Sequence, residues 1–252
     1  MVILKSSWEI DLIRKSGRIV AEALARLTKL VEPGITTLDL DRLAEEYILK
    51  RGAKPAFKGY RGYPYSLCAS VNEQVVHALP SERKLKEGDI ISLDLGSIVD
   101  GYYGDAAVTV PVGQVSDEAN RLIDVTQESL RRAIDAVHPG GRLSDISHAV
   151  QAAVEAEGFS VVRLFVGHGI GRSLHEEPQI PNFGPPGHGP VLKTGMVLAI
   201  EPMVNAGSPD VMILEDRWTA VTCDGSLSAH FEHTVALTEN GTEVLTSLDG
   251  RG

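Results

Sequence analysis

Two aspartates in one predicted hairpin are the first sign of chemistry in this sequence. The stretch from Asp89 to Val110 reads as two apolar strands joined by a turn at Asp100-Gly101. Asp94 lies in the first strand and Asp105 in the second, and we predict that they face each other, with the pairing centred between residues 99 and 100. Opposed like charges destabilise a sheet and burial raises the pKa of a carboxyl group, so a buried pair needs a cation or a shared proton. The alternative is two solvated aspartates at a strand edge.

Three further segments carry ionisable side chains at the ends of predicted strands, where they can reach a cleft. His168 lies in a glycine-rich segment, Glu201 follows the apolar run 196–200, and Glu232 precedes the apolar run 234–237. Together with the two aspartates, the two glutamates balance the charge of two divalent cations, and a neutral His168 adds a nitrogen ligand. Oxygen-rich coordination with one imidazole suits Mn, Fe, Co or Zn in a dinuclear site better than a structural zinc site. Such a centre lowers the pKa of water.

Two pairs of amphipathic helices are predicted to position these strands. The first helix begins at a capping box formed by Ser6 and Glu9 and runs to Pro33-Gly34, and the second runs from about Leu38 to Gly52. Two more are predicted over about 117–137 and 145–157, again with a Pro-Gly pair between them. The order of helix, turn, helix and strands therefore occurs twice.

The two halves also match in detail. Five positions recur 106 residues further on and three recur 107 residues further on: Val31, Pro33, Gly34, Asp39 and Gly52 as Val137, Pro139, Gly140, Asp145 and Gly158, then Leu85, Lys86 and Gly88 as Leu192, Lys193 and Gly195. Under the second offset Asp94 corresponds to Glu201. We predict an α/β (α+β) fold with pseudo-twofold symmetry, in which one domain over 1–252 consists of related halves at about 8–110 and 115–245. Each half would supply acids to a central cleft.

Motifs in a fixed order give the sequence a family resemblance from Trp8 to about Leu245. They are Ser70-Val71-Asn72-Glu73 with His77, Asp94-Leu95-Gly96, Gly101-Tyr102-Tyr103-Gly104-Asp105, Gly167-His168-Gly169-Ile170-Gly171, His175-Glu176-Glu177-Pro178, Glu201-Pro202-Met203, Trp218 and Glu232-His233-Thr234. This set resembles the type I methionine aminopeptidases of the short bacterial form. The resemblance implies a duplicated pita-bread fold, with an antiparallel sheet and outer helices, around a dinuclear metal cleft.

The resemblance also implies an activity and a role for each site residue. The activity is removal of the initiator methionine from nascent proteins and peptides with a small second residue. Two divalent ions would be held by Asp94, Asp105, His168, Glu201 and Glu232. His77 would contact the substrate near its amino end, His175 would hold the scissile carbonyl, and Glu201 would also shuttle protons. The methionine pocket would include Tyr60, Tyr63, Cys68, Leu174 and Trp218.

Three positions depart from the family pattern. Phe57 stands where many bacterial relatives have a small residue, and Leu174 stands where an aromatic residue is common. We expect these two to change the shape of the pocket and not the metal site. Ala78 follows His77 where the family usually has glycine, and we expect its methyl group to restrict the loop locally and at most to change the substrate preference.

The overall composition excludes several classes of protein. The chain has 252 residues, of which 43% are hydrophobic, enough to bury a sizeable core. Its formal net charge of −10 has the wrong sign for a protein that grips nucleic acid phosphates. No apolar run approaches the roughly 18–20 residues of a membrane span, and the N-terminus lacks a signal-peptide pattern. We therefore expect a cytoplasmic protein without membrane or direct nucleic acid binding. The family resemblance further implies a monomer that acts on peptides and nascent chains and associates transiently with the ribosome.

Two other functions compete with this interpretation. A proline-specific peptidase of the same superfamily, such as a prolidase or aminopeptidase P, uses a similar ligand set, and a non-catalytic pita-bread binding module keeps the fold without the chemistry. A zincin is excluded because position 179, where H-E-x-x-H needs histidine, is Gln179. Two further histidines, His230 and His233, bracket Glu232, and we expect both to point away from it and to have no part in metal binding.

Overall fold

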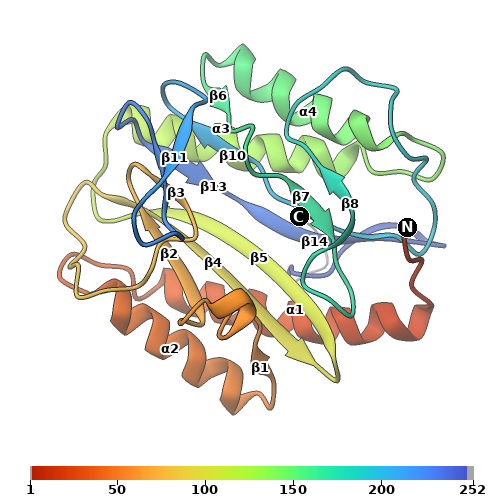
Figure 1. The fold of residues 1–252 in the computed structure, drawn as a ribbon, viewed down its shortest axis with the longest axis horizontal. Coiled ribbons are helices and arrows are strands. Elements are labelled where there is room, and N and C mark those ends of the chain that lie inside the picture. The colour runs from red at the N-terminus through yellow and green to blue at the C-terminus, as the bar shows by residue number, and fades with distance from the viewer. Residues whose placement is uncertain (1, 249–252) are drawn as a thin grey trace.

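A computed structural model describes residues 2–248, and its four helices flank a curved antiparallel sheet (Figure 1). The helices are α1 (Ser7–Thr28), α2 (Thr37–Lys50), α3 (Asp117–Asp135) and α4 (Leu143–Ala156). One hydrophobic cluster joins α1 and α2 to the first-half strands, as in the contact set that includes Leu24, Leu40 and Leu93. A second cluster, which includes Leu122 and Ile146, joins α3 and α4 to the second-half strands. Each half thus buries its helices against its own part of the sheet.

The main sheet has the order β1-β4-β5-β14-β9-β7-β8, with β2 added beside β4 and β15 beside β14. Its strands are β1 (Lys54–Pro55), β2 (Leu67–Val71), β4 (Ile90–Val99), β5 (Tyr102–Pro111), β7 (Gly167–Gly169), β8 (Glu176–Ile180), β9 (Val197–Ile200), β14 (Glu232–Thr238) and β15 (Gly241–Val244). The centre of this order is the β5–β14 pair, where the two halves meet.

Two small antiparallel sheets and a short helix complete the fold. One sheet has the order β13-β10-β6 and the other has the order β11-β12-β3. Their strands are β3 (Gln74–Val76), β6 (Ser160–Val161), β10 (Met203–Asn205), β11 (Val211–Ile213), β12 (Ala220–Thr222) and β13 (Ser228–His230), and the 3₁₀ helix η1 spans Tyr60–Gly62. No helix within residues 2–248 combines the length and apolar character needed to cross a membrane.

The predicted helices are confirmed, with small changes at their ends. The Ser6 hydroxyl accepts from the Glu9 N–H and the Glu9 carboxylate accepts from the Ser6 N–H, as a capping box requires. The first helix ends at Thr28, earlier than Pro33-Gly34. Beyond it the chain turns back toward the segment before β4, where the Gly34 N–H donates to Leu85 O at 2.8 Å. The first helix lies close on the sheet, since a Cβ on Gly104 would stand 2.5 Å from the Gly17 nitrogen.

The duplicated fold is visible in equivalent hydrogen bonds. Gly34 N–H donates to Leu85 O at 2.8 Å, and 106 residues later Gly140 N–H donates to Leu192 O at 3.0 Å. The second helix of each pair, α2 or α4, has 14 residues. Both Gly88 and Gly195 have φ near +90°, a backbone conformation that residues other than glycine rarely adopt. The predicted pseudo-twofold repeat therefore has a backbone basis.

The register of the hairpin differs from the prediction. Val99 pairs with Tyr102, Asp94 with Ala107, and Gly96 with Asp105, so the two aspartates are not directly opposed. The prediction was wrong because Asp100 and Gly101, with φ of 50° and 81°, are the two turn residues, which centres the pairing between them. Asp94 and Asp105 are diagonal neighbours on one face of the sheet, still close enough to interact.

Candidate metal centre and active site

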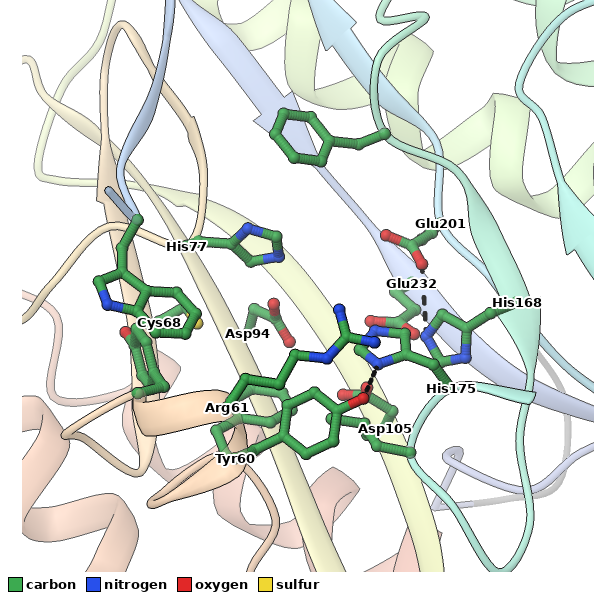
Figure 2. Close-up of a pocket in the computed structure, with 15 residues that line it drawn as sticks. Tyr60, Arg61, Cys68, His77, Asp94, Asp105, His168, His175, Glu201 and Glu232 are labelled. Atoms are coloured by element: carbon green, nitrogen blue, oxygen red, sulfur yellow. Dashed lines mark hydrogen bonds and ion pairs between the residues drawn. The ribbon is translucent and has the colours of Figure 1, made fainter. Parts of the chain in front are cut away.

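The five predicted ligands come from five different strand segments and line one cavity of about 290 Å³ (Figure 2). Asp94 and Asp105 project from the middle of β4 and β5, His168 is the central residue of β7, Glu232 is the first residue of β14, and Glu201 follows β9 directly. The two aspartates belong to the first half and the other three residues to the second. The cavity therefore lies where the halves meet.

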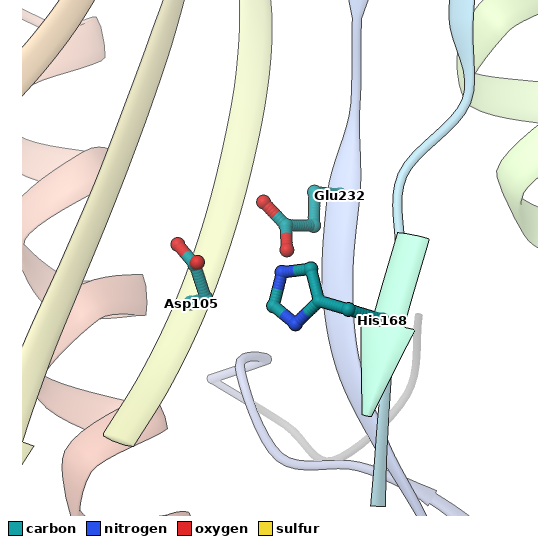
Figure 3. A group of neighbouring side chains, drawn as sticks. All are labelled: Asp105, His168 and Glu232. Atoms are coloured by element: carbon teal, nitrogen blue, oxygen red, sulfur yellow. The ribbon is translucent and has the colours of Figure 1, made fainter. Parts of the chain in front are cut away.

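Asp105, His168 and Glu232 form the tightest group, with ligand atoms that all lie within 4.8 Å of one another (Figure 3). Two hydrogen bonds hold Asp105 beside β14: its N–H donates to Thr234 Oγ1 at 3.1 Å, and the Thr234 hydroxyl donates to Asp105 O at 2.7 Å. His168 Nδ1 is 2.9 Å from the carbonyl oxygen of Gly169, so Nδ1 carries the proton. The lone pair of Nε2 is thereby free toward the cavity, 3.5 Å from Glu201 Oε1.

Burial shifts the pKa values of all five predicted ligands. It raises the pKa of Asp94 to about 7. Burial, reinforced by the charges of the neighbouring carboxylates, also raises the pKa values of Asp105, Glu201 and Glu232 well above their ordinary range. The pKa of His168 is lowered to about 3, chiefly by burial, so its imidazole is neutral and suited to ligation.

The donor set fits divalent cations. Asp94 Oδ1, Asp105 Oδ1 and Glu232 Oε1 are buried and have no hydrogen-bond partner within the described part of the chain. Buried oxygens of this kind are costly unless they coordinate an ion or share a proton. Four carboxylates and one neutral imidazole offer the oxygen-rich set that Mn, Fe, Co or Zn accepts, and a divalent cation would displace the protons that burial retains.

His77 and His175 stand beside the carboxylates, as Figure 2 shows. His175 precedes β8, its Nδ1 lies 2.7 Å from the Tyr60 hydroxyl, and its ring centroid lies 4.3 Å from that of His168. His77 follows β3 with φ of 60°, and its ring meets Phe165 edge-on at 5.4 Å. The pKa of each of the two histidines is lowered to about 4, mainly by burial. Both rings are therefore neutral near pH 7.

The rest of the cavity has apolar and aromatic walls. All five predicted pocket residues line it: Tyr60, Tyr63, Cys68, Leu174 and Trp218. Tyr63 and Trp218 pack edge-to-face at 5.0 Å, and the Tyr63 hydroxyl donates to the carbonyls of Leu67 and Ala78. With its polar end satisfied by backbone, Tyr63 presents its ring to the cavity. Such walls suit an unbranched thioether side chain.

The three departures from the family pattern have different consequences. Phe57 and Leu174 both line the cavity, so one aromatic and one aliphatic side chain contribute to its shape. The Phe57 ring packs closely on the strand that carries Asp94, since a Cβ on Gly96 would meet Phe57 Cε1 at 2.8 Å. At the third position, the positive φ of the loop falls on His77 and not on Ala78, so Ala78 needs no glycine-like conformation.

Two residues at the site were missed by sequence reasoning. Phe165 lies in the loop between β6 and β7 and lines the cavity, but a single aromatic residue in a loop carries no periodic signal. His230 was expected to point away from Glu232, and its contact with another predicted ligand was not foreseen: its Nε2 is 3.8 Å from Glu201 Oε2. Strand alternation gives no guide here, because β13 ends at His230 and β14 begins at Glu232. His233 does point away, with Nδ1 2.9 Å from Thr246 Oγ1.

Carboxylates and a histidine gathered from both halves of a duplicated antiparallel fold define a metal-dependent hydrolase. The model of metallopeptidase family M24 matches residues 11–239. The chain therefore belongs to metallopeptidase family M24.

Curated relatives match over almost the whole chain. The sequence is 56% identical over 248 residues to methionine aminopeptidase 1 of Bacillus subtilis, which covers 98% of this chain and 100% of that protein. It is 57% identical over the same length to a methionine aminopeptidase of Clostridium perfringens.

Solved structures agree with these relatives. The crystal structure of methionine aminopeptidase from Thermotoga maritima has a TM-score of 0.96 and 53% identity, over 98% of this chain and 100% of that chain. The prolidase from Pyrococcus furiosus has a TM-score of 0.80 at 24% identity and covers 97% of this chain and 65% of its own. The prolidase likeness extends to the fold alone.

Proposed function

We propose that this chain removes the initiator methionine from peptides and nascent chains whose second residue is small, with the help of divalent cations. The observation that carries the proposal is the meeting of Asp94, Asp105, His168, Glu201 and Glu232 in a cavity with apolar and aromatic walls. The high identity to named methionine aminopeptidases supports it. A prolidase function lacks such support, since the prolidase from Pyrococcus furiosus is only 24% identical to this chain and shares the fold alone.

The same five residues would hold two divalent ions, drawn from Co, Mn, Fe and Zn. When bound, such ions lower the pKa of water and polarise a carbonyl oxygen. The buried oxygens of Asp94, Asp105 and Glu232 that have no hydrogen-bond partner among residues 2–248 support this assignment. His168 would add its Nε2, because Nδ1 is committed to the Gly169 carbonyl.

The substrate would enter with its methionine side chain between the aromatic walls. Tyr63 and Trp218 present their rings there, and the buried Cys68 adds a soft, polarisable contact. His77 would accept from or donate to the amino end of the substrate. This placement brings the first peptide bond beside the carboxylates.

His175 and Glu201 would manage the reacting groups. The Tyr60 hydroxyl fixes His175 Nδ1 at 2.7 Å, which leaves Nε2 to donate a hydrogen bond to the scissile carbonyl as negative charge develops on its oxygen. Glu201 lies in the same cavity, where its carboxylate would take a proton and return it to the leaving amine. We expect the chain to act as a cytoplasmic monomer with transient ribosome contact.

The direct test is an assay of Met-Ala-Ser against an Xaa-Pro peptide, with and without added Mn or Co. We expect metal-dependent release of methionine from Met-Ala-Ser and little cleavage of the Xaa-Pro peptide. Preferential cleavage of the Xaa-Pro peptide would make the chain a proline-specific peptidase. Failure to cleave either peptide after verified metal loading would favour the non-catalytic binding module.

A further inference from the structure

His230 is the buried ionisable residue that the proposed mechanism leaves without a role. It is 1% exposed, and neither Nδ1 nor Nε2 has a hydrogen-bond partner among the described residues. A buried imidazole without partners is unfavourable, because its polar atoms have lost water and gained nothing. The nearby charged group is Glu201, whose Oε2 lies 3.8 Å from His230 Nε2.

Hydrogen bonds and strand pairing hold the backbone of His230 in place. His230 N–H donates to Thr109 Oγ1 at 2.8 Å, the Thr109 hydroxyl lies 2.8 Å from His230 O, and Ser92 Oγ lies 2.8 Å from Thr109 Oγ1. His230 also pairs with Met203 in the small sheet. This residue therefore sits at the junction of two sheets, tied to β4 and β5 through Ser92 and Thr109.

Glu201 is the partner that can adjust. It follows the last residue of β9, and its backbone carbonyl accepts from Asn182 Nδ2 at 3.0 Å. Its carboxylate lies between two imidazoles, with Oε1 3.5 Å from His168 Nε2 and Oε2 3.8 Å from His230 Nε2. The terminal torsion of glutamate is soft, so a small rotation brings Oε2 within hydrogen-bond distance of the His230 ring. Hydrogen bonds at active sites commonly tighten in this way when the site is loaded.

We propose that His230 is a positioning residue that donates an Nε2–H hydrogen bond to Glu201 Oε2 and so directs Glu201 Oε1 toward the metal centre. The inference rests on the proposed function for the identity of that centre. Partners behind metal ligands fix ligand orientation, and their loss typically lowers metal affinity or activity about 10–100-fold. His230 would act only through Glu201.

Substitutions at His230 test this role against a matched control. His230→Leu removes the donor, while His230→Gln retains an N–H donor of similar reach. His233→Gln alters the histidine that directly follows Glu232, whose ring contacts Thr246 and not Glu201. We expect His230→Leu to weaken Mn binding in calorimetry about 10–100-fold, His230→Gln to recover most of the loss, and His233→Gln to bind Mn like the unaltered chain.

Two measurements separate this role from the alternatives. Pulsed electron paramagnetic resonance of the Mn-loaded chain counts coupled imidazoles, and we expect the same number before and after His230→Leu. Loss of one coupled imidazole would make His230 a ligand, and Mn affinity of His230→Leu equal to that of His233→Gln would remove its role; either result would overturn the proposal. These readouts do not use peptide cleavage, so they stand apart from a failure of the proposed function.

The unaltered chain provides a test that does not depend on a variant folding. Nitrogen-15 NMR of the protein loaded with diamagnetic Zn reports which ring nitrogen of His230 carries the proton. The resonance is assigned by its absence in His230→Gln. We expect the Nε2–H tautomer, and we expect that proton to shift in Glu201→Gln. A His230 ring protonated on Nδ1 alone cannot donate to Glu201 Oε2 and would contradict the proposal.

Discussion

The two halves of the molecule deliver their acids to the centre in different ways. In the first half, Asp94 and Asp105 project from the middle of two ten-residue strands that form an unbroken ladder. In the second half, Glu201 and Glu232 lie where the short strand β9 ends and where β14 begins. A ladder fixes side chains by register, whereas Glu201 follows a strand end, where Asn182 donates to its backbone carbonyl and His230 Nε2 lies 3.8 Å from its carboxylate.

Charge removal at one ligand from each half should have the largest effect. We expect Asp105→Asn and Glu232→Gln each to lower kcat/KM for Met-Ala-Ser at least about 100-fold, because an amide is a weaker ligand than a carboxylate in a shared centre. Steady-state kinetics with saturating Mn measures the loss. Asp100→Asn is the matched control, since Asp100 is an exposed turn residue of the same hairpin with φ of 50°, which asparagine tolerates.

Comparison of these two variants tests whether the halves share one centre. Nearly full activity in either variant, with a large loss in the other, would mean that one half alone holds the working ion. A large loss in Asp100→Asn would show that the hairpin responds to charge removal in general.

Metal removal should lower stability, and the effect should depend on pH. Folding raises the pKa of Asp94 to about 7, so without metal the folded state holds this proton more tightly than the unfolded state. That contribution is complete at pH values below the ordinary pKa and is lost as pH rises through 7, so the metal-free Tm should fall from pH 5 to pH 8. Metal at about 100 times its Kd should raise Tm by about 5–10 °C.

Differential scanning calorimetry at both pH values checks this sign. With one fixed metal concentration at both pH values, the rise in Tm on metal loading should be larger at pH 8 than at pH 5, because the protons that burial holds at low pH compete with the cation and raise its Kd. An equal rise at both values, or a larger rise at pH 5, would show that the carboxylates do not carry the metal.

A single hydrogen bond behind His175 should have the smallest effect. Tyr60→Phe removes the hydroxyl that lies 2.7 Å from His175 Nδ1. A hydrogen bond of this kind contributes about 1 kcal/mol net, so we expect kcat/KM to fall about five-fold, mostly in kcat. Tyr65→Phe, in the same loop but outside the cavity lining, is the control. A fall confined to KM would place Tyr60 in substrate binding and not behind His175.

The regular parts of the molecule could be predicted from sequence. The capping box at Ser6 and both helix pairs follow local patterns, and the structure contains them. The turn at Asp100-Gly101 was predicted correctly, but the centre of the hairpin pairing was predicted one residue too early in the sequence. Local rules thus give the elements, and the turn geometry sets which side chains meet.

The irregular parts could not be predicted in the same way. His230 and Glu201 are 29 positions apart in the sequence. They meet because β10 pairs with β13, which places Met203, two residues after Glu201, opposite His230. Phe165 reaches the cavity from a loop with no periodicity. Contacts of this kind depend on how sheets join, which no single strand pattern encodes.

Anomalous diffraction from crystals loaded with Mn shows whether the two halves share one metal centre. We expect two Mn peaks inside the cavity, coordinated by Asp94 and Asp105 from one half and by His168, Glu201 and Glu232 from the other. Mn peaks elsewhere with none among these side chains would contradict this expectation.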